Sequence, residues 1–190
     1  DGVNLGVVHR DVTHGNLLLT FDGQMKIVDF GIAFMKARES PDTQLGELKG
    51  KPSYMPPEQI RQEGVDRRSD VYSLSVVLHE LVTARKLFTR ENVVATVLAV
   101  ERDEVPTPSS VVGTLPKGLD AIIMKGLARD PNARFQDARE MARSLDDLCV
   151  AHAGESLEAF VDRELVAEQT AHRLWLQAVL AGNPPEEALD

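Results

Sequence analysis

The segment from Ser69 to about Ala84 places the strongest constraint on what this chain can fold into. A surface helix carries its apolar residues on one stripe, but here they cover most of the circumference. The residues concerned are Val71, Leu74, Val76, Val77, Leu78, Leu81 and Val82. Such a helix has to be enclosed by other elements, and Ser69-Asp70 supplies a suitable N-terminus. We therefore predict a buried central helix around which the rest of the chain packs.

Helical patterns on the C-terminal side provide the elements that would enclose it. Helices are predicted near Glu91–Arg102, Lys117–Ala128, Phe135–Ala151 and, after a break at Gly154, about Ser156–Ala181. The turn signal Asp130-Pro131-Asn132 separates the second helix from the third. Between Met35 and Pro57 no period is sustained, and the glycine, proline and charged residues there predict a long surface loop.

A β-hairpin is predicted near the start of the chain. Two β-prone runs, Leu17–Phe21 and Gln24–Val28, flank Asp22-Gly23, which is the signal of a two-residue turn. That turn would place Asn16 directly opposite Asp29 at the open end of the hairpin. An amide and a carboxylate side by side offer the oxygen ligands that Mg²⁺ requires.

Composition narrows the class of protein. The 190 residues include 21 Lys and Arg against 30 Asp and Glu, a formal net charge of −9, which argues against binding to nucleic acid or to an anionic membrane. Cys149 is the single cysteine, which excludes an intrachain disulfide, and its apolar helical setting predicts an inert buried thiol. The longest apolar run is too short to span a bilayer, and no secretory signal is visible. We expect a cytoplasmic protein, although the parent protein could be membrane-anchored elsewhere.

Several short motifs occur in a specific order and spacing. The set consists of His9-Arg10-Asp11, Asn16, Asp29-Phe30-Gly31, Tyr54-Met55-Pro56-Pro57-Glu58, Asp70 and Arg134. Each motif alone would be weak, but their combination is specific. Together they resemble the C-terminal lobe of a eukaryotic-like protein serine/threonine kinase of the type found in bacteria. The resemblance covers about Val7 to Ala151.

This resemblance implies a mainly α fold, a kinase-like C-lobe in which a helical bundle bears a short β-hairpin with the catalytic and metal-binding loops. Residues 1–151 would be a partial kinase domain, and residues 152–190 a C-terminal helix and acidic tail. The expected ligands are ATP, Mg²⁺ or Mn²⁺, and a protein substrate. The family builds its Gly-rich loop and phosphate-binding lysine in an N-terminal lobe, which is missing before Val7. This chain alone is therefore expected to bind ATP poorly and to transfer no phosphate.

The resemblance also assigns the residues that would carry the chemistry. Asp11 would be the catalytic base, which takes the proton of the substrate hydroxyl. Asn16 and Asp29 would hold the metal ion and, through it, the phosphates. Leu18 would lie on the floor of the adenine pocket, and Asp70 would anchor the backbone of the catalytic loop. The alternative for Asp11, Asn16 and Asp29 is that they are ordinary turn and cap residues.

Other matched positions would have structural roles. Glu58 and Arg134 resemble a buried ion pair that ties the end of the long loop to the helices. His9 and Phe30 resemble the lower members of the hydrophobic stack that links the two lobes of the family. Gly31 completes the Asp-Phe-Gly motif. For Glu58 and Arg134 we expect a structural role and not a catalytic one.

Regulation and the remaining histidines are less well defined by the sequence. Arg10 would pair with a phosphorylated residue in the long loop, where Ser40 and Thr43 are possible phosphorylation sites. Simple loop polarity explains these two residues equally well. Ser75 stands where the family usually has Gly. Four histidines lack partners at ligand spacing and are expected to be solvated or packed: His14, His79, His152 and His172.

Two departures from the family pattern concern one site. The family has Lys two residues after the catalytic Asp, where this chain has Thr13, and a Gly-Thr pair before the Tyr54 motif, where it has Gly50-Lys51. The missing cation and the missing hydroxyl reappear on opposite segments. We therefore predict an exchange in which Lys51 supplies the charge and Thr13 the hydroxyl. The alternatives are decay of both positions, or a Lys51 that is merely solvated.

Two functions from different classes remain open. The chain could be a fragment of an active kinase that transfers the γ-phosphoryl group of ATP to serine or threonine hydroxyls, with a role in signalling. It could instead be a kinase remnant that binds or scaffolds partners. Tyrosine specificity is disfavoured because the catalytic loop lacks the Ala/Arg-rich sequence of tyrosine kinases. The C-terminal helix would either pack on the lobe, which we favour, or dock a missing domain.

Overall fold

The computed structural model describes residues 7–30, 51–152 and 154–181, which form two compact units. The first unit comprises residues 7–17, 27–30 and 51–152, and the second comprises residues 18–26 and 154–181. The described residues are mainly helical and contain a two-stranded antiparallel hairpin, as the sequence predicts. Within these ranges no helix is both long and apolar enough to cross a membrane.

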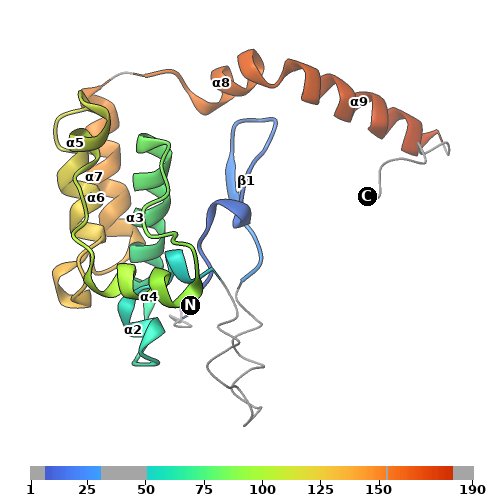
Figure 1. Ribbon diagram of the computed structural model, residues 1–190. Coiled ribbons are helices and arrows are strands. Elements are labelled where there is room, and N and C mark those ends of the chain that lie inside the picture. Colours follow the sequence, from blue (N-terminus) through green and yellow to red (C-terminus); the bar gives the residue numbers. More distant parts are fainter. Residues whose placement is uncertain (1–6, 31–50, 153, 182–190) are drawn as a thin grey trace, which may run out of the picture. The chain divides into compact units, whose positions relative to one another are not determined.

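Helix α3 (Arg67–Thr83) is the central element of the first unit. In Figure 1 it lies beside three helices that contact it, α5 (Pro108–Val112), α6 (Leu119–Gly126) and α7 (Ala138–Ala151). Val71, Val76 and Val77 are fully buried, which confirms the prediction of a buried helix, although Leu81 is 58% exposed. The larger core gathers around this helix and includes Tyr72, Phe88 and Ile123. Apolar residues on nearly every side of α3 therefore determine the architecture of the unit.

The helix boundaries depend on caps that the hydrophobic pattern does not show. Helix α3 begins two residues before Ser69, because the Asp66 carboxylate accepts a hydrogen bond from the Arg68 amide at 2.8 Å. Asn92 caps α4 (Val93–Arg102) and Asp137 caps α7 in the same way, so both helices start later than predicted. The short helices α2 (Pro57–Ile60) and α5 escape prediction because each is barely one turn long. The loop predicted from Met35 to Pro57 contains, near its end, the 3₁₀ turn η2 (Pro52–Tyr54).

Helices α3 and α6 approach closely where Ser75 faces Gly126. Ser75 is fully buried, and its hydroxyl donates to the Val71 carbonyl at 2.8 Å. A Cβ atom at Gly126 would collide with the Ser75 hydroxyl oxygen. Glycine at position 126 therefore makes room for the Ser75 side chain.

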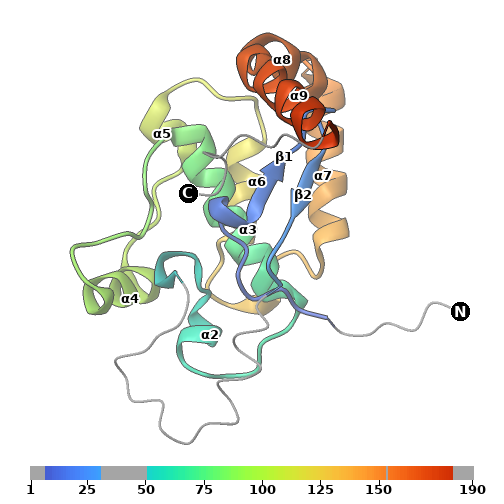
Figure 2. The same ribbon diagram turned by 90° about the vertical axis from the view of Figure 1, so that its right-hand side faces the viewer.

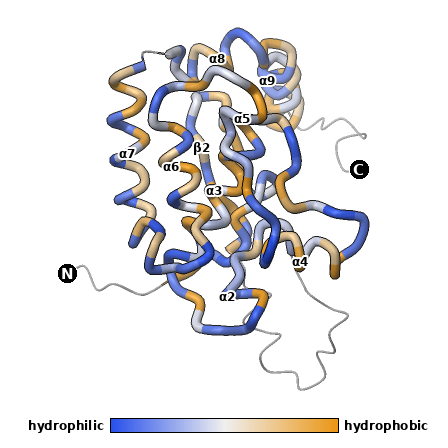
Figure 3. The backbone as a smooth tube through the Cα atoms, turned by 60° about the vertical axis from the view of Figure 1, so that its left-hand side comes forward, coloured by the Kyte–Doolittle hydropathy of each residue, from blue (hydrophilic) through white to orange (hydrophobic). Residues whose placement is uncertain are grey.

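Helix α7 is amphipathic, with apolar and polar residues alternating along it in Figure 3. Met141 is fully buried, and Leu145 packs against the same small core, which also contains Phe135. Further along, Leu148 would contact a side chain at Gly118, so the inner stripe continues through position 148. Cys149 is exposed, and the prediction of a buried thiol is therefore wrong.

The register of the hairpin differs from the prediction by one residue. Strands β1 (Leu17–Leu19) and β2 (Met25–Ile27), which run side by side in Figure 2, are joined by a three-residue loop: the Gly23 amide donates to Thr20 O, and the Thr20 amide to Gln24 O. A two-residue turn of type I′ requires positive φ at both central residues, but of Asp22 and Gly23 only Gly23 (φ 74°) has it. Asn16 is consequently paired with Val28, whose amide donates to its carbonyl at 2.9 Å, and not with Asp29.

The second unit contains the tip of this hairpin and the C-terminal helices. The single helix predicted over Ser156–Ala181 is two, α8 (Leu157–Glu164) and α9 (Val166–Leu180), because the backbone is not helical at Leu165. The Phe21 ring lies 5.2 Å from the His172 ring, which stacks on Trp175 at 6.0 Å. Packing of these helices on the lobe remains a prediction.

Candidate active site

The backbone of the His9-Arg10-Asp11 segment is anchored by Asp70. The two carboxylate oxygens of Asp70 accept hydrogen bonds from the amides of His9 and Arg10, both at 2.8 Å. Arg10 has φ 66°, a left-handed conformation that costs about 1–2 kcal/mol for a residue with a Cβ, so it needs such an anchor. Gln59 adds a third contact by donating to Arg10 O at 3.2 Å. Burial raises the pKa of the Asp70 carboxyl, while the two amide bonds favour its charged form.

The Asp11 side chain is oriented by Asn16. The side-chain nitrogen of Asn16, Nδ2, donates to Asp11 Oδ2 and to the Asp11 carbonyl, each at 2.8 Å. The 3₁₀ turn η1 (His14–Asn16) brings the two residues together. A hydrogen bond from the backbone N–H of Asn16 to Thr13 O at 3.0 Å closes this turn. Within the described residues the second carboxylate oxygen, Oδ1, makes no hydrogen bond. Asp11 therefore presents a fixed carboxylate with one oxygen available to a proton donor.

Asp29 is held next to this loop by His9. The His9 Nε2 atom lies 3.0 Å from the carbonyl oxygen of Val28, and its ring lies 4.6 Å from that of Phe30. Asp29 itself has φ 56°, a left-handed conformation, and its side chain is exposed. The two contacts of His9 thus fix the chain on both sides of Asp29.

The donor set of Asn16 and Asp29 is suitable for a hard cation. Asn16 uses its side-chain nitrogen, Nδ2, to bind Asp11, and its side-chain oxygen, Oδ1, has no hydrogen-bond partner among the residues that the structure describes. The same is true of the Asp29 carboxylate, and both offer the oxygen ligands that Mg²⁺ requires. No cluster of three or more His, Cys, Asp or Glu side chains that could hold a metal occurs in the described ranges. The assignment of Asn16 and Asp29 as metal ligands therefore remains a prediction, and two protein ligands would need substrate phosphates or water to complete the coordination.

Thr13 and Lys51 approach the same point of the catalytic loop. A Cβ atom at Gly15 would lie 2.9 Å from Lys51 Nζ and 3.9 Å from Thr13 Oγ1. The ammonium group belongs to a largely exposed side chain, whereas Thr13 is 1% exposed and its hydroxyl has no hydrogen-bond partner in the described part of the chain. A buried hydroxyl without a partner is costly, so this is a position from which a ligand could gain a hydrogen bond.

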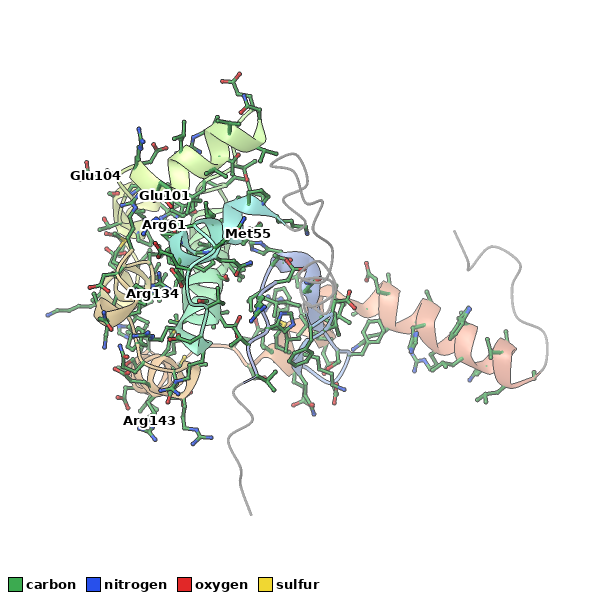
Figure 4. All side chains as sticks on the ribbon, turned by 90° about the horizontal axis from the view of Figure 1, so that it is seen from below. Met55, Arg61, Glu101, Glu104, Arg134 and Arg143 are labelled. Carbon is green, nitrogen blue, oxygen red and sulfur yellow. The ribbon has the colours of Figure 1, made fainter. Side chains whose placement is uncertain are left out.

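Glu58 and Arg134 form a buried, bidentate ion pair. Both contacts are 2.7 Å, and the Ser69 hydroxyl donates to the same carboxylate at 2.7 Å. The other three guanidinium N–H groups donate to the carbonyls of Arg68, Ala128 and Arg129, so all five donors are used. Burial by itself would raise the pKa of Glu58, but the bonds from Arg134 and Ser69 together hold it below its ordinary range. In Figure 4 Arg134 lies among the helices, while Arg143 of α7 projects outward.

A second buried carboxylate, that of Glu80, lies close to the catalytic loop and was not singled out from the sequence. It accepts hydrogen bonds from Tyr54 and Lys86 at 2.8 and 2.9 Å, and His14 lies 3.5 Å away. His14 is therefore packed against Tyr54 and Glu80, which agrees with the packed role predicted for it as one of two options. A glutamate within the apolar run of α3 was the available signal, since charges rarely occur in a buried helix without a partner.

Some predicted site residues lie elsewhere. Leu18 belongs to the second unit and is 51% exposed, so its contact with an adenine ring remains a prediction. Gly31, Ser40 and Thr43 lie outside the described residues. Their proposed roles likewise remain predictions.

Comparison with known proteins gives a consistent result. The model of the protein kinase domain family matches residues 4–145. The tyrosine-protein kinase MasK of Myxococcus xanthus is 41% identical over 155 residues, which are 82% of this chain and 24% of MasK. The serine/threonine-protein kinase PknB of Mycobacterium tuberculosis is 39% identical over 155 residues, 81% of this chain and 24% of PknB. A probable serine/threonine-protein kinase of Streptomyces coelicolor is 41% identical over 137 residues, 72% of this chain and 20% of that protein.

The chain thus spans about a quarter or less of the length of these relatives. The match nevertheless includes the loop around Asp11, the segment around Asp29, the ion pair of Glu58 and Arg134, and the central helix. It ends within α7, and α8 and α9 lie beyond it. By its motifs, its geometry and these similarities, the chain belongs to the protein kinase family.

Proposed function

We propose that this chain is the catalytic lobe of a protein kinase that transfers the γ-phosphoryl group of ATP to serine or threonine hydroxyls of proteins. The observation that carries the proposal is the fixed carboxylate of Asp11, which Asn16 orients and the Asp70 anchor places. The Asn16 side chain binds both the backbone carbonyl and the carboxylate of Asp11, so the position of this acidic side chain is fixed. A general base does need a fixed position, because proton transfer requires heavy atoms within about 2.6–3.2 Å.

In this proposal the substrate hydroxyl binds at Asp11 Oδ1. As the hydroxyl oxygen attacks the γ-phosphorus, its proton passes to Asp11, and the bond between the γ-phosphorus and the bridging oxygen breaks. The bond electrons leave with ADP, and the product is the phosphorylated side chain. Because Asp11 Oδ1 makes no hydrogen bond to any residue that the structure describes, proton transfer to it requires no rearrangement of the Asn16 contact.

Asn16 and Asp29 would hold Mg²⁺ or Mn²⁺ through the Asn16 carbonyl oxygen and the Asp29 carboxylate. A bound cation of this kind neutralises charge on the phosphates as the phosphoryl group moves. The amide nitrogen of Asn16 remains on Asp11, so one side chain links the base to the metal site. Replacement by Asp would keep an oxygen ligand but lose both hydrogen bonds to Asp11.

Lys51 and Thr13 are proposed as an exchanged pair. The ammonium group of Lys51 would stabilise charge on the phosphoryl group, and the Thr13 hydroxyl would donate a hydrogen bond within the site. Their convergence beside Gly15 supports this arrangement. Lys51→Thr should then lose activity, and adding Thr13→Lys should restore part of it. Unchanged turnover in Lys51→Thr would contradict the exchange.

The relatives include both a serine/threonine kinase and a tyrosine kinase by name, so they do not decide the specificity. The proposed specificity for serine and threonine rests instead on the sequence of the loop around Asp11, which lacks the Ala/Arg-rich form of tyrosine kinases. A peptide library with Ser, Thr or Tyr at one position, otherwise identical, tests it directly. Preferential labelling of Tyr would contradict the proposed specificity while leaving phosphoryl transfer intact.

The activity itself should be tested with the coding region upstream of Asp1 included. Radiolabelled ATP, Mg²⁺ and a generic protein substrate give the readout, with Asp11→Asn as the control variant. We expect phosphoryl transfer that Asp11→Asn abolishes, and none from the 190-residue chain alone. A longer protein that has the Gly-rich loop and strand lysine yet transfers no phosphate would contradict the proposal and favour a binding or scaffold module.

A further inference from the structure

Glu80, Tyr54, Lys86 and His14 form one hydrogen-bonded network around a single hydroxyl group. The Tyr54 hydroxyl donates to Glu80 Oε2 at 2.8 Å and accepts from Lys86 Nζ at 2.8 Å, and His14 Nδ1 lies 3.1 Å from it. Lys86 also donates to Glu80 Oε2 at 2.9 Å, and the Leu87 amide donates to Glu80 Oε1 at 2.9 Å. A hydroxyl has one donor and two acceptor sites, so these partners use the full capacity of Tyr54.

The charges of the network are balanced. Burial raises the pKa of the Tyr54 hydroxyl, which is therefore uncharged near neutral pH. The hydrogen bonds to Tyr54 and then to Glu80 raise the pKa of Lys86, which stays cationic. One ammonium group thus faces one buried carboxylate, with Glu80 4% exposed. Removal of Lys86 would leave that carboxylate without its cation.

The network joins the two turns that carry the proposed catalytic groups. Tyr54 ends the turn η2, whose preceding residue is Lys51, and its amide donates to Lys51 O at 2.9 Å. His14 begins the turn η1, which ends at Asn16. The Ser73 hydroxyl holds Tyr54 from its backbone side by donating to the Tyr54 carbonyl at 2.8 Å. A displacement of the Tyr54 ring would therefore move η2 away from η1.

We propose that Glu80, Lys86 and Tyr54 are positioning residues that hold the Lys51 turn against the catalytic loop. Their role in phosphoryl transfer rests on the function proposed above, while the mechanical link between the two turns does not. None of the three touches the reacting atoms in this proposal. They act through His14 on the loop that bears Asn16, and through the η2 backbone on Lys51.

Lys125 provides a matched control for Lys86. It pairs with Glu140 at 2.9 Å and lies over the Phe135 ring at 4.0 Å, as Lys86 pairs with Glu80 at 2.9 Å and lies over the Tyr54 ring at 5.4 Å. Both lysines are partly exposed, with side-chain exposures of 58% for Lys86 and 42% for Lys125. Lys125 lies on α6, and Glu140 on α7, and neither is part of η1 or η2.

Amide hydrogen exchange in the 190-residue chain tests the proposal without any need for catalysis. In Lys86→Met and in Tyr54→Phe, the Tyr54 and Asn16 amides should exchange about fivefold faster, which is the effect of one ordinary hydrogen bond. Amides of α7 should be unchanged, and Lys125→Met should leave η1 and η2 as in the parent chain. Unchanged exchange at Tyr54 and Asn16, or an equal increase throughout the first unit, would overturn the proposal.

In the longer, active protein, Lys86→Met should lower kcat about fivefold with an unchanged KM for ATP, and Lys86→Arg should restore part of the loss. A rate equal to that of Lys125→Met would overturn the catalytic part of the proposal. If the parent protein transfers no phosphate but the exchange rates change as expected, the proposed function fails and the positioning link stands. The two proposals therefore fail independently.

Discussion

The ion pair of Glu58 and Arg134 yields the sharpest prediction on stability. Replacement of Arg134 by Met keeps much of the volume of the side chain but removes all five hydrogen bonds of the guanidinium group. The Glu58 carboxylate, 4% exposed, would keep only its bond from Ser69. A buried charge that loses its partner costs about 3–5 kcal/mol. Three backbone carbonyls also lose one donor each, so we expect a loss of at least about 4 kcal/mol.

Urea denaturation followed by far-UV circular dichroism measures the effect. With a slope of about 2 kcal/mol per M, a loss of about 4 kcal/mol lowers the midpoint by about 2 M. Arg143→Met is the matched control, because Arg143 projects outward from α7 (Figure 4), and its effect should stay within about 0.5 kcal/mol.

The double variant Glu58→Gln with Arg134→Met separates the two contributions. It removes the isolated charge and should therefore lose less stability than Arg134→Met alone. A loss below about 1 kcal/mol in Arg134→Met, or a double variant less stable than the single one, would refute the reasoning.

Three further predictions address other parts of the fold. The pKa of Glu58 is lower in the folded chain than in the unfolded one, so the ionised carboxylate contributes its full stabilisation above about pH 4.5. This stabilisation is lost as pH falls through the pKa of the folded chain, and acid titration of Glu58→Gln should lack that loss of stability. Gly126→Ala should destabilise the first unit by about 1–3 kcal/mol in thermal unfolding, and Ser75→Gly should restore most of it. Gly23→Ala should cost at least about 1 kcal/mol, since Gly23 has φ 74° and a Cβ there would collide with the Glu158 backbone; equal melting temperatures would contradict this.

The sequence predicts the central helix well because its signal lies in one continuous segment. An apolar surface all around residues 71–82 requires enclosure regardless of what encloses it. The helix ends were less accurate, since they depend on single side chains such as Asp66 and Asp137. A cap shifts a boundary by two or three residues without any change in hydrophobic pattern.

The hairpin shows why register is harder to predict. Asp22-Gly23 signals a two-residue turn, but the Thr20 hydroxyl donates to Gln24 O at 2.9 Å and accepts from the Gln24 amide at 3.0 Å, which favours the longer loop. One additional loop residue changes the partner of Asn16 from Asp29 to Val28. The residues expected at the metal site were identified from motifs, but the geometric argument for their pairing was wrong.

The network at Glu80 could not be assembled from the sequence. Its members come from the catalytic loop, the turn after the long loop, the central helix and the segment that follows, and no local pattern connects them. Only a folded chain brings Lys86 to Tyr54. The exchange of Thr13 and Lys51 stays a prediction, and it could be formulated from the sequence because two departures from a known pattern complement each other.

The close crossing at Ser75 and Gly126 has a consequence for how this sequence can change. The hydroxymethyl group on α3 occupies the space that any side chain on α6 would need, so the two positions share a fixed volume. Substitutions there are coupled: the order in which they arise matters, because enlarging position 126 first passes through an overpacked intermediate. The volume available at the crossing is therefore a property of the two positions together, and neither can be enlarged without a matching reduction of the other.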